Sequence, residues 1–216
     1  MTEELMLIQR NSLGRVDSEQ AQAGADSAAN HLMAQGLPEY AYMAAQRKIF
    51  IANAFASTAF APAAAPPTTS PGWVLWNGNA EDSLLLLSVG IISISGTLGL
   101  GLSMVGGVTT QEQLDATMAE YASSVIKQAG GGSQGSGCRI VSNPTILGTP
   151  AYEIIAARDQ VSAVSVGSGL VADLKGSILV PPRFGYALEV VAPVGTTALF
   201  TVSFKFAKVR LRLADS

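Results

Sequence analysis

A long stretch without any charged residue, from Ser83 to Thr110, most constrains how this chain can fold. Its sequence, SLLLLSVGIISISGTLGLGLSMVGGVTT, is long enough to cross a membrane as a helix. Its periodicity favours strands instead, because large and small residues alternate through Leu98–Met104 and again through Ile92–Ser95. Gly96-Thr97, between these two runs, is expected to form a turn or bend. The stretch therefore predicts two or three strands of a β-domain.

The residues on either side of the stretch also disfavour a membrane helix. Membrane-spanning helices are flanked by an excess of Lys and Arg on one side and by aromatic residues at both interfaces. Here Glu81 and Asp82 precede the stretch, and Gln111 and Glu112 follow it. The sequence therefore predicts that the protein does not associate with a membrane.

The composition indicates a protein whose surface is covered by other protein. Charged residues make up 13% of the chain, against about 25% in ordinary soluble proteins, and hydrophobic residues make up 48%. A monomer with so few charges has little polar surface to present to water, and association removes apolar surface from water. We therefore expect an assembly protein more than a free monomeric enzyme.

Net charge and cysteine content argue against other classes. The formal net charge of -3 disfavours non-specific binding to nucleic acid. Cys138 is the single cysteine, so no disulfide can form within the chain. The first residues, MTEELMLIQR, lack the basic and apolar regions of a secretory signal, and synthesis in a cytoplasm is expected.

The chain has two regions of different composition. Residues 1–46 are rich in Ala, Gln and small polar residues, and Gly36-Leu37-Pro38-Glu39 fits the end of one helix and the start of another. This region is predicted to be an N-terminal arm, helical or extended, that a partner orders; a flexible terminus is the alternative. Residues 47–216 contain eight or nine short strands separated by turns, with one helix candidate at Gln111–Gln128. The predicted fold is mainly β: a jelly roll or β-sandwich of about eight strands with a partly helical arm.

The sequence contains no recognisable catalytic, cofactor or metal motif. His31 is the only histidine and has no cluster of Cys or carboxylates near it, which argues against a metal site or a triad. Cys138 precedes Arg139, and a neighbouring cation can lower the pKa of a thiol. No base partner accompanies it, so a small residue at the start of a strand is the simpler interpretation.

Carboxylates and aromatic residues give two further candidates. Glycoside hydrolysis needs two facing carboxylates, and nothing in the sequence brings Glu153, Asp159 and Glu189 together. Arg158-Asp159 is either a ligand-binding ion pair or a polar turn, and we favour the turn. Trp73 and Trp76 could stack against a sugar, but their spacing on a strand points them to opposite faces, so one is expected in the core.

The last predicted strand carries the candidate interface residues Lys208, Arg210 and Arg212, which share one face. Phe204 and Phe206 have the same parity, so the apolar face changes side near Ala207; a bulge or a new packing environment would explain this. The basic face either meets an acidic neighbour or is a solvated edge protected by charge.

The strand and turn phrases at both ends of the β-region resemble those of a known family. The run from Val180 to Phe204 resembles the closing strands of jelly-roll virion proteins of tailed bacteriophages. Asn53–Pro71 and Trp76–Asn79 fit the opening strands of the same pattern. The resemblance implies a capsid decoration (cement) protein or another structural role in a virion, often as a trimer bound to the major capsid protein or another virion protein. It implies no functional residue.

Two other functions remain open. A receptor- or glycan-binding β-module of a phage tail or head fibre would need an exposed aromatic patch. An enzyme would need a deep pocket that holds two facing titratable groups.

Overall fold

A computed structural model describes residues 43–44, 48–53, 60–99, 101–109, 126–128, 137–158, 169–192 and 196–210. The chain divides into two units, Met1–Lys48 and Ile49–Ser216, and the strands lie in the second. The predicted arm, 1–46, falls outside the described residues except for Met43 and Ala44, which are helical. The helical character of the arm therefore stays a prediction.

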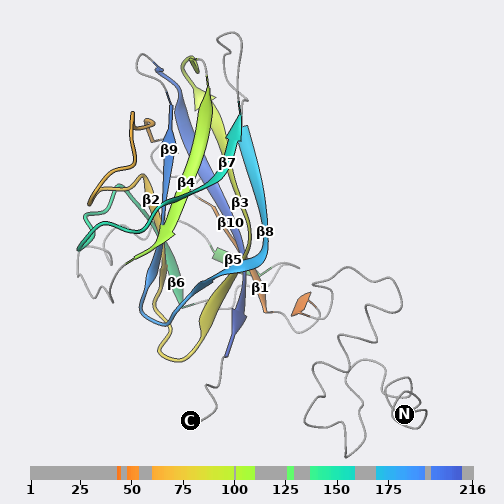
Figure 1. The fold of residues 1–216 in the computed structure, drawn as a ribbon. Helices are drawn as coiled ribbons and strands as arrows, with labels where there is room; N and C mark the ends of the chain where they lie inside the picture. The colour runs from red at the N-terminus through yellow and green to blue at the C-terminus, as the bar shows by residue number, and fades with distance from the viewer. Residues whose placement is uncertain are drawn as a thin grey trace, which may run out of the picture. The chain divides into compact units, whose positions relative to one another are not determined.

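The second unit is mainly β, and its described residues form two antiparallel five-stranded sheets in a sandwich-like arrangement (Figure 1). One sheet, sheet A, has the strand order β5-β1-β10-β3-β8, and the other, sheet B, has the order β6-β2-β9-β4-β7. The strands are β1 Ile49–Asn53, β2 Trp73–Asn77, β3 Ser83–Ser95, β4 Leu102–Val108, β5 Ile126–Gln128, β6 Cys138–Ser142, β7 Glu153–Arg158, β8 Gly169–Val180, β9 Gly185–Val191 and β10 Leu199–Val209.

Strands far apart in the sequence pair with one another. β1 pairs with β10, β2 with β9, β3 with β8 and β4 with β7, all antiparallel. The early strands β3 and β4 also pair with the late strands β10 and β9, at the centres of their sheets. Most contacts that hold the domain together are therefore non-local.

The main core lies between the two sheets. Every second residue of β10 faces inward, and Phe200, Val202, Phe204 and Phe206 are fully buried. The opposing layer is built by side chains of sheet B, Trp73, Leu75, Met104, Tyr186, Leu188 and Val190. A smaller cluster on the outer face of sheet B contains Val74, Trp76, Val141, Ile146 and Ala187, with Tyr152 packed against it.

The uncharged stretch forms β3 and β4, as its periodicity predicts. Gly96, between them, has a φ of 74°, which glycine adopts without the steric cost that other residues meet. Leu98, Leu102 and Met104 are buried, so the large residues of this alternation face the core. In the part of the chain that the structure describes, no helix is long and apolar enough to span a membrane.

The second alternating run faces the opposite way from what hydrophobicity alone would suggest. Ile92 and Ile94 of β3 are exposed, whereas Ser93 between them is buried opposite Phe200. Because a strand alternates strictly, the small Ser93 occupies the inward position beside a large aromatic ring and the isoleucines face outward. Val171 of β8, opposite Gly90, is exposed on the same outer face of sheet A.

Gly106 and Gly107 of β4 allow close packing on both sides of sheet B. A Cβ atom at Gly106 would collide with the ring and hydroxyl of Tyr186, and one at Gly107 would lie 2.6 Å from the carbonyl oxygen of Ala151. Residues that lack a side chain are needed where backbone or rings approach this closely. The glycine pair is therefore explained by packing.

The helix predicted at Gln111–Gln128 needs correction. It is wrong at its end, because Ile126–Gln128 form β5 and pair with β1; the preceding residues lie outside the described part. Pairing across a sheet overrides the local helical pattern at β5.

The pairing of β10 with β3 contains a bulge, but its extra residue belongs to β3 and not to the last strand, where the bulge was one of two explanations predicted. Lys205 pairs with Ser88 and Phe206 with Leu86, so Leu87 of β3 is an unmatched extra residue. Such a bulge bends and twists the strand that contains it. Phe206 remains buried, and Lys208 follows it on the same side at the point where the core ends.

We expect truncation of the β10 core to destabilise the domain strongly. Phe204→Ala removes a fully buried ring and should lower the free energy of unfolding by about 3–5 kcal/mol, measured by denaturant titration. Lys205→Ala, next to it on the exposed side of the strand, should change it by less than about 0.5 kcal/mol. Similar effects of the two substitutions would contradict the inward placement of Phe204.

Candidate functional site at the polar end of the sandwich

The predicted basic face lies at one end of the sandwich, beside the turn that joins β2 to β3. Lys208 Nζ is 3.3 Å from Asp82 Oδ2 and donates a hydrogen bond to Asn79 Oδ1 at 3.0 Å. Arg210 forms ion pairs with Glu81, at 2.7 Å, and with Asp82, at 3.3 Å. Arg212 lies outside the described residues. The polar end is therefore defined here as Asn77, Asn79, Glu81, Asp82, Lys208 and Arg210.

Asn77 organises this end from a fully buried position at the end of β2. Its amide nitrogen donates to the carbonyl oxygens of Asp82, Val180 and Pro181, at 2.8, 3.2 and 2.9 Å. Its Oδ1 accepts from the backbone and side-chain nitrogens of Asn79. One buried side chain thus connects the β2–β3 turn with the β8–β9 turn, and its polar atoms are satisfied.

The charges of the polar end compensate one another. Lys208 and Asp82 are partly buried, whereas Arg210 and Glu81 are more than half exposed. Exposed ion pairs contribute about 0–1 kcal/mol, so the Arg210 pairs contribute less than the hydrogen bonds of Asn77. The acidic neighbour that was one of the two predictions for the basic face is the turn between β2 and β3 of the same chain. A role for Lys208, Arg210 and Arg212 in an interface between chains stays a prediction.

The remaining predicted site residues are not brought together. Cys138, half-buried at the start of β6, accepts a hydrogen bond from Asn79 Nδ2 at 3.5 Å. Glu153 is exposed on β7, whereas Glu189 is buried in β9. His31 and Asp159 lie outside the described residues. Among the side chains that the structure describes, no group of three or more His, Cys, Asp and Glu could hold a metal ion.

Trp73 and Trp76 occupy opposite faces of β2, as predicted, and both are buried. Trp73 belongs to the main core and Trp76 to the cluster on the outer face of sheet B. The interpretation of this pair as an exposed sugar-stacking platform is therefore wrong, because a stacking platform must be accessible to the sugar. The outer cluster that buries Trp76 could not be foreseen from the spacing of the two residues.

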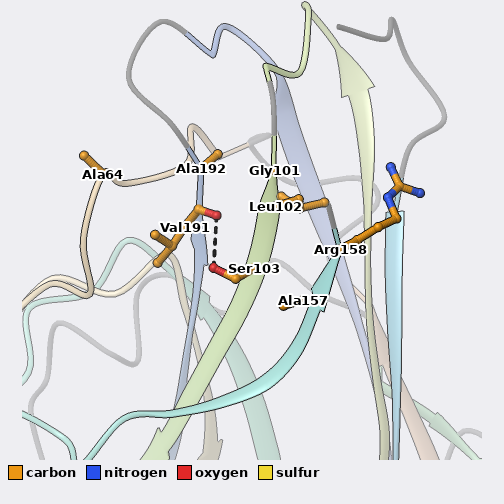
Figure 2. A pocket seen from close by; sticks show the side chains of 8 residues that line it. All are labelled: Ala64, Gly101, Leu102, Ser103, Ala157, Arg158, Val191 and Ala192. Carbon is orange, nitrogen blue, oxygen red and sulfur yellow. Dashed lines mark hydrogen bonds between the residues drawn. The ribbon is translucent and has the colours of Figure 1, made fainter. Parts of the chain in front are cut away.

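A cavity of about 320 Å³ opens beside β4, β7 and β9 (Figure 2). Ala64 and Arg158 lie on opposite sides of it, and the Ser103 hydroxyl donates to the carbonyl oxygen of Val191 at 3.3 Å. Arg158 is the only ionisable residue among the described residues that line it. These residues do not supply the two facing titratable groups that acid–base catalysis would use.

Glu189 is a functional candidate whose burial the sequence did not reveal. It lies on the outer face of β9 and is 1% exposed. Its Oε2 accepts a hydrogen bond from the Gly72 nitrogen at 2.8 Å, and its Oε1 accepts one from the Val190 nitrogen at 2.9 Å. Loss of hydration raises the pKa of Glu189 to about 7, although the hydrogen bonds act in the opposite direction.

Comparisons with known proteins give no relative for this chain. No family model matches it, and neither the curated proteins nor the solved structures contain a match.

We expect the buried amide to matter more to stability than the exposed ion pairs at the polar end. Asn77→Ala removes the amide that donates to the Val180 and Pro181 carbonyl oxygens, although the Phe184 nitrogen still donates to Pro181, and should lower the free energy of unfolding by about 3 kcal/mol. Arg210→Ala should lower it by less than about 1 kcal/mol. Thermal and denaturant unfolding measure both; a larger effect of Arg210→Ala would reverse this ranking.

Proposed function

We propose that the protein is a non-enzymatic structural protein of a viral particle with a jelly-roll fold, and that it assembles with copies of itself. The strand pairing is the observation that carries this proposal. Without β5 and β6, the two layers are β1-β10-β3-β8 and β2-β9-β4-β7. In this arrangement the first strand pairs with the last, and the second strand pairs with the second to last. This order is expected when one long hairpin folds into two Greek keys. Viral capsid proteins, lectins and cupins use this architecture.

The residues favour the structural role among the functions of that architecture. A metal-dependent cupin-type site would need several imidazoles, and the chain has a single histidine. A lectin-type site would use accessible aromatic rings, whereas both tryptophans are buried. The low content of charged residues supports a surface that other protein covers. We favour the role of a capsid decoration (cement) protein, with a trimer as the expected oligomer.

The outer face of sheet A supplies the apolar surface that such an assembly would bury. Ile92, Ile94 and Val171 are exposed on neighbouring strands of this face, and Val171 is 76% exposed. Apolar side chains gathered on one sheet face are typical of surfaces that bind protein. The outer face of sheet B differs, because its own apolar cluster includes residues from outside the strands, Ile146 and Tyr152. We therefore place the contact between copies on sheet A.

We expect the purified protein to form a symmetric oligomer at micromolar concentration, measured by light scattering coupled to size-exclusion chromatography. Val171→Glu should dissociate it, because a charge buried in an apolar contact loses its hydration without gaining a partner. Ile154→Glu is the matched control, since Ile154 is 71% exposed but lies on sheet B. That variant should keep the oligomer of the wild type.

The outcomes separate the proposed function from its alternative. A monomeric wild type would contradict assembly through copies, and equal dissociation by both substitutions would contradict the placement on sheet A. Specific hits on a glycan array from a monomer would support a receptor- or glycan-binding module instead. Electron microscopy of purified virions with antibody label would test the position on the capsid surface.

A further inference from the structure

The segment between β1 and β2 includes a proline-rich loop whose two ends meet beside β9. At its first end, the Ala63 nitrogen donates to the Val190 oxygen at 2.9 Å, and the Ala192 nitrogen donates to the Ala63 oxygen at 3.0 Å. At its second end, the Gly72 nitrogen donates to the Glu189 carboxylate. We call Ala63–Gly72 the proline loop. Its neck is therefore held to adjacent residues of one strand (Figure 1).

Further backbone hydrogen bonds join the proline loop to the segment that precedes β7. The Ile146 nitrogen donates to the Thr69 oxygen at 2.8 Å, and the Asn143 nitrogen donates to the Gly72 oxygen at 2.8 Å. Most residues between Ala64 and Ser70 are exposed, so the loop is not anchored by burial of its own side chains. A loop with few buried apolar contacts opens at a lower free energy than the core strands do. Among these anchors the Glu189 carboxylate is the one ionisable group, because the others are backbone atoms.

Glu189 is almost isolated among titratable groups. The sequence from Phe60 to Gly72 contains no ionisable residue, and neither does the segment from Asn143 to Ala151. Val105 of β4 lies opposite Glu189, and on β7, beyond β4, Glu153 and Arg158 are exposed. Tyr152 is the titratable group that faces it: burial and then the charge of Glu189 raise the pKa of Tyr152 to about 12. Among the described residues packed against it, the Glu189 carboxylate thus meets no cation that would compensate its charge when it ionises.

We propose that Glu189 is a pH-dependent latch for the proline loop: the neutral carboxyl group keeps the neck closed against β9, and ionisation releases it. In the closed state the carboxylate is cut off from water, whereas in the open state water can hydrate it. Opening therefore favours ionisation, and ionisation favours opening, by the same factor. Release exposes the outer side of β9 and leaves the sandwich core intact.

The direction of the pH effect follows from the two states. The pKa of Glu189 is about 7 with the loop closed and returns towards its ordinary value of 4.5 when the loop opens. Below pH 4.5 both states are protonated, so the opening equilibrium does not depend on pH. As the pH rises from 4.5 to 7, the open state loses its proton first and becomes more populated. Between pH 5 and pH 8 the opening constant should rise on the order of 50-fold.

Amide hydrogen exchange on the full-length protein tests this latch. Protection factors, corrected for the intrinsic pH dependence of exchange, should fall on the order of 50-fold from pH 5 to pH 8 at Ala63, Gly72 and Ile146. The amide of Phe204, in the core strand β10, should keep its protection over the same range. The proposal would be overturned if the protection of the loop amides did not change with pH, or if the Phe204 amide lost protection to the same extent.

Three variants identify the titrating group. Glu189→Gln keeps the size of the side chain but cannot ionise, so its loop protection should be independent of pH, even if lower because the amide offers one acceptor oxygen instead of two. Glu153→Gln, an exposed change on the same sheet, and Tyr152→Phe should both keep the wild-type pH dependence. If Glu189→Gln fails to fold, the wild-type protein and Tyr152→Phe together still show whether the loop responds to pH and whether Tyr152 is the titrating group. Loss of the pH dependence in Tyr152→Phe would contradict the assignment to Glu189.

Discussion

The pairing of β10 with β3 at the centre of sheet A is the interaction on which the rest of this structure depends. It joins the last described strand to one from the first half of the chain, and it directs Phe200, Phe204 and Phe206 against sheet B. The same strand then carries Lys208 to the turn before β3, where the ion pairs close the polar end. The packing of the core and the ion pairs at the polar end thus both depend on the register between β10 and β3. A shift of this register by one residue would turn every side chain of β10 to the opposite face of the sheet.

Asn77 and Glu189, two of the buried polar side chains, differ in how fully they are satisfied. Asn77 is neutral, and its amide meets acceptors and donors from two turns, so burial costs little and the turns become fixed. Glu189 also accepts two backbone hydrogen bonds, but these do not offset the loss of hydration of a charge. A buried group of the first kind fixes a structure, whereas one of the second kind makes it respond to pH.

Much of the β-region followed from local patterns. The alternation in the uncharged stretch predicted β3 and β4, and the parity change near Ala207 corresponds to the end of the core, where Lys208 follows Phe206 on the same side of β10. The candidate site was predicted less well. The basic face was located by its spacing, but its carboxylate partners lie more than a hundred residues earlier in the chain. The burial of Glu189 left no local signal, because its cover comes from loops that are distant in sequence.

The sequence by itself determined the class of the fold, the absence of an intrachain disulfide and the low content of charge, because periodicity and composition are local properties. Only the tertiary structure decided which face of each strand is buried. It placed Ser93 inward and the neighbouring isoleucines outward, and it buried both tryptophans on opposite sides of one sheet. The physical reason is that alternation fixes two faces without saying which one another layer will cover, and that layer is supplied by strands and loops far away in the sequence.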